Sequence, residues 1–214
     1  NVGVPSLMNE TAIGFLMEKE LNYLEEKINK PIHPYILILG GAKIGDKIEL
    51  IHNMVEKTDT ILIGGAMAFT FLKVQGQNVG SSLIDEKNLH VAEDILRLSE
   101  KRNTKLVLPV DVVAATELSH DAPWRVANLE ELEKDETGYD IGPETTLNFE
   151  LLLSGNKTIV WNGPMGVFEI PAFSTGTQAI ACAVRDQTEE GAVTIIGGGD
   201  TASAIKNYGI TDGF

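Results

Sequence analysis

Short apolar runs that end directly in glycine constrain the fold of this chain more than any other feature. The runs at residues 35–39, 60–63 and 192–196 each lead into two or three consecutive glycines, and the run at 158–162 leads into Gly163. Continuous apolar runs of this length are typical of strands that are buried on both faces of a parallel sheet. Because parallel strands end at the same edge of a sheet, we expect the four glycine turns to lie together.

Segments with helical patterning alternate with these runs. The alternation predicts an α/β fold, a three-layer αβα, Rossmann-like arrangement with a doubly wound, mostly parallel sheet. A further strand is predicted at residues 105–113, and the polar segment 128–140 is predicted to be a solvated loop. We expect helices at residues 10–30, 46–57, 90–101, 144–153, 174–188 and 201–208, with another that ends near residue 74.

The charge of the chain excludes several classes of partner. Its 17 basic and 31 acidic residues give a formal net charge of −14, and such a surface repels nucleic acids and anionic membranes. A phosphate ligand must therefore be held by local groups. No apolar run approaches the roughly 20 residues that a membrane span needs. The single cysteine, Cys182, fits a buried core position in a reducing compartment, and we expect a cytoplasmic monomer.

The glycine turns indicate a ligand that carries phosphate groups. Glycine allows a close approach to the backbone, and the helix after each turn offers free N–H groups and the positive end of its dipole. A Walker A loop is excluded, because Asp46 stands where its lysine should be. Gly197, Gly199 and Ala202 match the dinucleotide pattern G-x-G-x-x-G/A. That pattern also needs an acidic residue about 20 positions later and normally opens its domain, so a dinucleotide-dependent oxidoreductase is a minor alternative.

Seven segments together resemble those of the phosphoglycerate kinase family, in the same order along the chain. The resemblance covers nearly all 214 residues and corresponds to the C-terminal half of the family's sequence. The segments are residues 40–48 (GGAKIGDKI), 63–73 (IGGAMAFTFLK), 108–111 (LPVD), 140–144 (DIGPE), 159–169 (IVWNGPMGVFE), 173–176 (FSTG) and 196–201 (IGGGDT).

This resemblance implies the nucleotide-binding half of a glycolytic phosphotransferase. The family moves a phosphoryl group between 1,3-bisphosphoglycerate and ADP, giving 3-phosphoglycerate and ATP, with Mg²⁺. Residues 31–214 would form the nucleotide-binding domain, and residues 1–30 a connecting, hinge-like helical region. The phosphoglycerates would bind only through the family's N-terminal half, which, like its C-terminal tail, would lie outside this chain. We therefore expect the chain to bind Mg·ADP or Mg·ATP with little or no turnover. A non-catalytic nucleotide-binding module is the alternative.

The resemblance also implies roles for individual residues. Lys43 would follow the transferring phosphoryl group, and Gly199, at the start of a helix, would be the second catalytic position. Asp200 would hold Mg²⁺, directly or through water, although an aspartate before a helix is also a common N-cap. Glu169 would bind the ribose hydroxyls. The full nucleotide-binding set is Gly41, Ala42, Lys43, Lys47, Gly64, Gly65, Leu83, Gly138, Tyr139, Asn162, Pro164, Val167, Glu169, Gly198, Gly199, Asp200 and Thr201.

Within this set, Lys43 and Lys47 are four residues apart at the start of a predicted helix, so both could reach an anion from one helical face. Two positions and one segment depart from the family pattern. Gly45 stands in place of serine or alanine, Ala66 replaces a third glycine, and residues 136–139 (ETGY) replace a Trp-Met-Gly segment. The last change falls in the expected adenine pocket, so the shape of that pocket does not follow from the resemblance.

Overall fold

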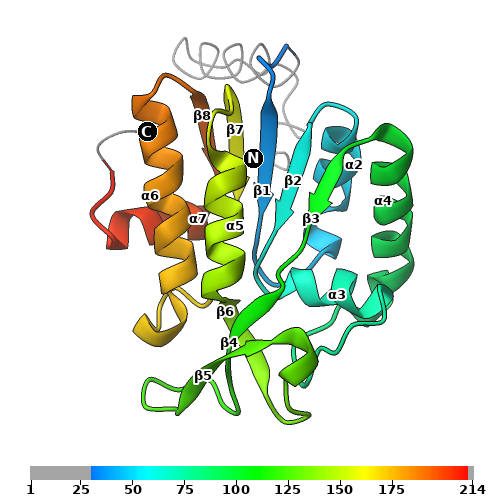
Figure 1. Ribbon diagram of the computed structural model, residues 1–214, viewed down its shortest axis with the longest axis vertical. Helices are drawn as coiled ribbons and strands as arrows, with labels where there is room; N and C mark the ends of the chain where they lie inside the picture. The colour runs from blue at the N-terminus through cyan, green and yellow to red at the C-terminus, as the bar shows by residue number, and fades with distance from the viewer. Residues whose placement is uncertain (1–29, 212–214) are drawn as a thin grey trace, which may run out of the picture. The chain divides into compact units, whose positions relative to one another are not determined.

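Five parallel strands form the central sheet of the structure, a computed structural model that describes residues 30–211 (Figure 1). The strands stand in the order β3 (Lys105–Val107), β2 (Thr60–Ile63), β1 (Tyr35–Leu39), β7 (Thr158–Asn162) and β8 (Val193–Gly197). All five residues of the central strand β1 are buried, as a strand covered on both faces requires. The bounds of β1, β2 and β7 are those predicted from their apolar runs.

The register of the sheet aligns the ends of four strands. Leu39, the last residue of β1, lies opposite Ile63 of β2 and Asn162 of β7. Asn162 in turn lies opposite Gly197 of β8. The turns that follow these strands therefore begin at one level of the carboxyl edge, which confirms that the glycine turns converge.

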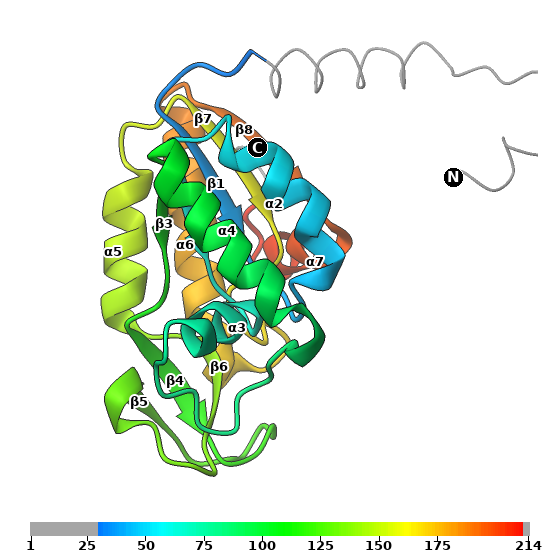
Figure 2. The same cartoon turned by 90° about the vertical axis from the view of Figure 1, so that its right-hand side faces the viewer.

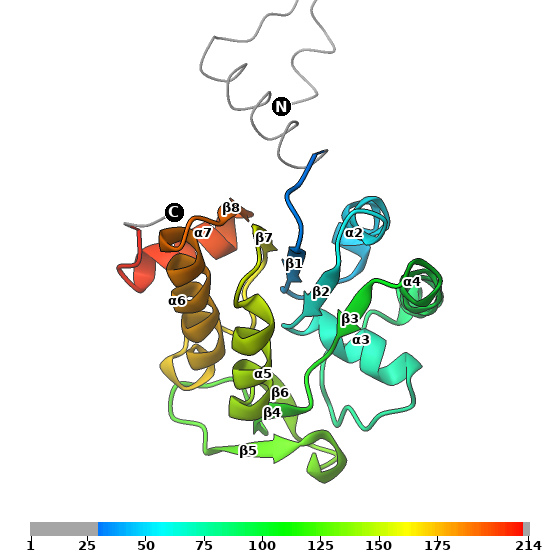
Figure 3. The same cartoon turned by 45° about the horizontal axis from the view of Figure 1, so that its top comes forward.

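Helices cover both faces of this sheet (Figures 2 and 3). They are α2 (Ile48–Val55), α3 (Met67–Val74), α4 (Leu89–Arg102), α5 (Pro143–Leu153), α6 (Thr175–Glu189) and α7 (Gly199–Asn207). On one face α5 and α6 contact each other and share a core with Ile36, Ile38 and Trp161 of the sheet. On the other face α2 and α4 pack together. This arrangement confirms the predicted three-layer αβα fold.

The single strand predicted at residues 105–113 is wrong, because the structure divides it between two sheets. β3 pairs with β2 at the edge of the parallel sheet, and the chain then passes through Pro109 into β4 (Asp111–Ala115). Proline has no N–H group to donate to a strand ladder, so a strand seldom continues through it. The chain instead turns at this point into a second sheet.

The second sheet is antiparallel and has three strands. β4 lies between β5 (Trp124–Asn128) and β6 (Thr137–Ile141). The solvated loop predicted at residues 128–140 is therefore wrong, since it contains most of β6. It also contains Leu129 and Leu132, whose side chains are buried in a core shared with α3. Because Leu129 and Leu132 stand among charged residues, the sequence pattern does not indicate that they are buried.

The chain divides into two units, Asn1–Ile32 and His33–Phe214, and all the helices and strands named above lie in the second. The predicted helix at 10–30 falls outside the described residues except for Lys30, so the predicted connecting region stays a prediction. Cys182, expected in the core, is half-buried at its margin. No helix in the described part of the chain is long and apolar enough to cross a membrane.

Candidate functional site

The loops after β1, β2 and β7 are joined to one another through their backbones. The N–H group of Gly41 donates to the carbonyl of Pro164 over 2.9 Å, and that of Gly65 donates to the carbonyl of Met165 over 2.9 Å. A Cβ atom on Gly40 would lie 2.0 Å from the Pro164 oxygen. The glycines were predicted to let a ligand approach the backbone, but here they first let the three loops approach one another.

Lys47 lies at the carboxyl ends of β1 and β7. Its Nζ atom donates to the carbonyl of Gly40 over 2.6 Å and to the carbonyl of Asn162 over 2.7 Å. Lys47 ends a short 3-10 turn (Gly45–Lys47), and α2 begins only after it. The predicted helix over 46–57 therefore begins too early, and Lys43 lies before the turn in the loop. The two lysines do not share one α-helical face.

Lys43 is the more available of the two cations. Its side chain is exposed, and it has no hydrogen-bond or ion-pair partner among the described residues. The ammonium group of Lys47, in contrast, already lies against carbonyl oxygens whose partial charges it neutralises. The structure thus places the two lysines predicted to contact phosphate in different environments.

The start of α7 lies beside the end of β7. The side chain of Thr201 is fully buried, and its hydroxyl oxygen accepts the N–H group of Gly163 over 2.7 Å. Asn162 lies against the backbone of Gly197 and Gly198, where added Cβ atoms would come within 3.1 and 3.4 Å of its amide atoms. The Thr201 hydroxyl therefore links the first turn of α7 to the loop after β7. Its N–H group, in the first turn of α7, has no partner within the helix.

Asp200 is exposed in the first turn of α7, next to Gly199. The N-cap position of this helix is Gly198, and no side chain bonds to the cap, so the alternative role of Asp200 as an N-cap is wrong. A carboxylate in the first turn interacts favourably with the helix dipole. Its oxygens make no hydrogen bond to another described residue and remain open to a ligand.

A cleft of about 380 Å³ opens at this edge of the sheet, and its walls are mainly apolar. Leu83 and Leu118, which are 50% and 53% exposed, contribute large apolar side chains to it. Of the predicted residues, the cleft is lined by Gly41, Ala42, Gly65, Leu83, Gly138, Tyr139, Pro164, Val167, Glu169 and Asp200. Thr137, from the segment 136–139 expected at the adenine pocket, lines it too. Sequence reasoning assigned no site role to Ala66, Leu118, Gly166 and Phe168, which line it as well.

The other predicted residues lie outside this lining. They lie in the loops, the 3-10 turn, the end of β7 and the start of α7 at the same sheet edge: Lys43, Lys47, Gly64, Asn162, Gly198, Gly199 and Thr201. A larger open groove of about 590 Å³ runs along residues 105–110 and contains none of the predicted residues. Sequence and geometry therefore agree on the smaller, more apolar cleft.

Gly138 lines the cleft, and the structure shows a reason for glycine at this position that the sequence did not reveal. A Cβ atom there would lie 2.3 Å from Cζ of Phe69. Its N–H group donates to the hydroxyl oxygen of Ser82 over 3.0 Å. The close packing against the Phe69 ring of α3 therefore requires glycine at this position, in addition to any contact with a ligand.

Two carboxylates near the cleft have opposite environments. Asp140 is buried and accepts the N–H groups of Gly176, at the start of α6, and of Ile141 over 2.7 and 2.9 Å. Burial raises the pKa of Asp140 to about 8, although the two hydrogen bonds from the backbone act to lower it. Glu169 is exposed at the cleft and has no hydrogen-bond partner among the described residues. Of these two carboxylates, Glu169 is the one that is open to hydrogen bonds from a ligand.

The sheet, its aligned glycine turns and the cleft define an α/β protein of the Rossmann-like type with a candidate ligand site at the carboxyl edge. The family model described as phosphoglycerate kinase matches residues 1–214. The chain therefore belongs to the phosphoglycerate kinase family, which confirms the resemblance drawn from its motifs.

Individual relatives agree with this assignment. The phosphoglycerate kinase of Chloroherpeton thalassium is 46% identical over 210 residues, and that of Thermosipho africanus is 48% identical over 213 residues. These alignments cover 98% and 99% of this chain and 53% of each relative. The solved structure of phosphoglycerate kinase from Coxiella burnetii superposes with a TM-score of 0.89 at 40% identity, covering 94% of this chain and 51% of that one. The chain spans about half the length of the relatives that it matches.

Proposed function

We propose that the cleft binds an adenine nucleotide with Mg²⁺ and that this chain supplies the nucleotide-binding half of a glycolytic, cytoplasmic phosphotransferase. The whole enzyme would move a phosphoryl group between 1,3-bisphosphoglycerate and ADP. One observation carries the proposal: an apolar cleft and the free first turn of α7 meet at the carboxyl edge of the sheet. A flat apolar base and an anionic phosphate chain need these two environments side by side.

The base and the ribose would occupy the apolar end of the cleft. Leu83, Leu118 and Val167 offer the apolar surface that a purine ring requires, and Tyr139 lines the same cleft. Glu169, whose carboxylate has no described partner, would accept the two ribose hydroxyls. The base would thus be held mainly by apolar contact and the sugar by charge-assisted hydrogen bonds.

The phosphates would lie toward the first turn of α7 and Lys43. The N–H groups of Gly199 and Thr201 belong to that first turn, and the positive end of the helix dipole favours an anion there. Phosphoryl transfer depends on positioning and charge neutralisation more than on covalent catalysis. The exposed ammonium group of Lys43 would follow the transferring phosphoryl group. Lys47 would stabilise the loops after β1 and β7 through its bonds to the carbonyls of Gly40 and Asn162.

Asp200 fits a magnesium ion that arrives with the nucleotide. Among residues 30–211 no cluster of three or more histidine, cysteine or acidic side chains could hold a metal ion unaided. Mg²⁺ prefers one or two carboxylates together with phosphate oxygens, and Asp200 offers one open carboxylate at the cleft. When bound, the ion would neutralise charge on the phosphates.

The two alternative functions differ in their support. The dinucleotide pattern of Gly197, Gly199 and Ala202 follows β8, an edge strand, whereas such a pattern normally follows the strand that opens its domain. This position disfavours an oxidoreductase. A non-catalytic nucleotide-binding module uses the same cleft and differs only in turnover, so it stays the second candidate.

Titration of the 214-residue chain with Mg·ADP tests the proposed ligand. Calorimetry is expected to show saturable binding, and millimolar Mg·ADP is expected to raise the midpoint of thermal unfolding because a ligand that binds only the folded state stabilises it. NADH under the same conditions is expected to give neither effect. Absence of heat and of a thermal shift with Mg·ADP would refute the nucleotide site.

Glu169 is expected to act on the ribose alone. Glu169→Gln should weaken Mg·ADP binding by about 1–2 kcal/mol, the scale of a hydrogen bond to a charged group. The same substitution should leave the affinity for 2′,3′-dideoxy-ADP nearly unchanged, and the exposed Glu93 of α4 provides a matched control, Glu93→Gln. Equal losses for the two ligands, measured by calorimetry, would contradict a ribose role.

A further inference from the structure

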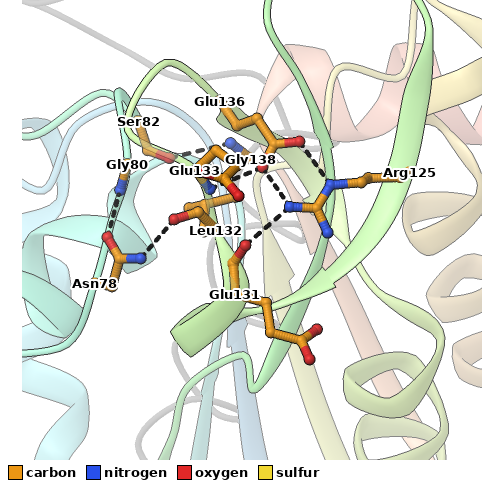
Figure 4. A network of polar contacts seen from close by, with 9 residues as sticks. All are labelled: Asn78, Gly80, Ser82, Arg125, Glu131, Leu132, Glu133, Glu136 and Gly138. Carbon is orange, nitrogen blue, oxygen red and sulfur yellow. Dashed lines mark hydrogen bonds and ion pairs between the residues drawn. The ribbon is translucent and has the colours of Figure 1, made fainter.

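An ion pair behind one wall of the cleft joins β5 to the segment before β6. Arg125 donates from Nε and Nη2 to the two carboxylate oxygens of Glu136, each over 2.7 Å, and its Nη2 also donates to the carbonyl of Glu131 over 2.8 Å (Figure 4). The N–H group of Glu133 donates to Oε2 of Glu136 over 2.8 Å. The side chain of Glu136 is only 10% exposed, whereas that of Arg125 is 42% exposed. Two parallel bonds from one guanidinium group to one carboxylate fix geometry better than a single contact does.

The bonds from Arg125 and from the Glu133 backbone lower the pKa of Glu136, which keeps this carboxylate charged. Both of its oxygens are occupied inside the protein. Neither Arg125 nor Glu136 lines the cleft. The pair therefore acts on the cleft only through the backbone that it holds.

That backbone is bonded to the loop that carries Leu83. The carbonyl of Glu136 accepts the N–H group of Ser81 over 2.8 Å, and the hydroxyl oxygen of Ser82 accepts the N–H group of Gly138 over 3.0 Å. Lower in the same network, Nδ2 of Asn78 donates to the carbonyl of Leu132 over 2.6 Å. Residues 78–83 and 131–138 are thus one connected structure, which presents Leu83 and residues 137–139 to the cleft.

We propose that the Arg125–Glu136 pair is a positioning device that sets the wall formed by Leu83, Thr137 and Tyr139 and thereby the affinity of the cleft for the base of a nucleotide. The inference rests on the proposed function. It concerns the base, because among the described residues neither Lys43 nor the first turn of α7 is hydrogen-bonded to residues 78–83 or 131–138. The nearest link to the phosphate end is the bond from the N–H group of Gly45 to Asp85, which lies two residues beyond Leu83. The segment that departs from the family pattern, residues 136–139, owes its shape to this pair.

Comparing the binding of Mg·ADP with that of Mg·pyrophosphate distinguishes positioning of the cleft wall from general destabilisation of the chain. Glu136→Gln and Arg125→Met are expected to weaken Mg·ADP binding about five- to tenfold, since the wall must be ordered anew on binding. Binding of Mg·pyrophosphate, which lacks base and ribose, should change by less than about twofold. Arg125→Lys keeps the positive charge but loses the pair of parallel N–H donors, so an intermediate loss of Mg·ADP affinity is expected. Arg102→Met, which removes an exposed pair with Glu56 between α4 and α2, is the matched control and should change neither ligand.

Amide hydrogen exchange of the free chain tests the structural step without any nucleotide. In Glu136→Gln the amides of Ser81 and Gly138 should exchange about tenfold faster or more, whereas those of β1 should keep their protection. Unchanged exchange at both amides would overturn the inference, even if the chain binds Mg·ADP normally. Equal losses for Mg·ADP and Mg·pyrophosphate would overturn it as well. Failure of the unsubstituted chain to bind Mg·ADP would instead refute the proposed function, and faster exchange in the same samples would still support the positioning of the wall.

Discussion

Replacing Gly65 by alanine is expected to lower the free energy of unfolding by about 3 kcal/mol or more. Gly65 has a φ angle of 63°, a region that residues with a Cβ atom occupy at a cost. The new Cβ atom would also lie 2.5 Å from the nitrogen of Gly41 and 3.0 Å from the oxygen of Pro164. Both neighbours are backbone atoms, so no side-chain rotation relieves the contact. Urea unfolding followed by circular dichroism measures the loss.

Gly76→Ala separates the two causes of this loss. Gly76 has a φ angle of 76°, and a Cβ atom there would have no other atom within 4 Å. The substitution should therefore cost only the conformational strain, about 1–2 kcal/mol. The excess at Gly65 then measures the close approach of the loops after β1, β2 and β7. Equal losses at the two positions would contradict the view that backbone contact between these loops requires glycine.

The parallel sheet could be predicted from the sequence because its signal is local. The run at 35–39 is apolar throughout, and the run at 158–162 has three consecutive apolar residues between Thr158 and Asn162, as burial on both faces of a sheet favours. The antiparallel sheet has no such signal. Trp124 and Val126 in β5 are 53% and 45% exposed, and Ala127 is the one buried residue of the strand, so β5 has no sustained alternation of apolar and polar residues to recognise. β6 contains Gly138, which strands disfavour, and the close packing at that residue comes from the Phe69 ring of α3, which is distant in sequence.

The candidate site could be predicted at the level of its location but not of its contacts. Parallel strands that end in glycine must place those turns at one edge, so the edge followed from the sequence alone. The ammonium group of Lys47, however, contacts the carbonyl of Asn162, 115 positions away, and nothing near Lys47 indicates that partner. Leu118 reaches the cleft from the connection between β4 and β5, a region without a recognisable pattern. Contacts between residues distant in sequence depend on the packed fold.

Turnover by the 214-residue chain is expected to stay below about 10⁻³ of that of an intact phosphoglycerate kinase, although the chain binds Mg·ADP. The loss has the scale seen when positioning and charge neutralisation are removed from a reaction. Phosphoglycerates carry several negative charges, and a chain with a net charge of −14 attracts them only through a dedicated basic patch. The arginines are the natural source of such a patch.

All four arginines of the sequence already lie beside carboxylates of the chain itself. Their partners are Asp94 for Arg97, Glu56 for Arg102, Glu136 for Arg125 and Asp186 for Arg185. These pairs come from different helices and strands, so they do not form one cationic surface. Arg125, for instance, lies on β5, whereas the other three arginines lie on helices. The structure thus strengthens the expectation that phosphoglycerate is bound by a part of the enzyme other than this chain.

A coupled assay of ATP formation from 1,3-bisphosphoglycerate and Mg·ADP measures this difference, with an intact relative as the reference and calorimetry as evidence that the chain is folded. Adding the N-terminal half of such a relative in trans should raise turnover, because it would supply the cationic groups that this chain lacks. Lys43→Ala should abolish that gain if Lys43 follows the transferring phosphoryl group, whereas Lys73→Ala, on α3, should preserve it. Near-normal turnover by the purified chain alone would show that residues 1–214 bind both substrates, and the division of the site between two halves would then be wrong.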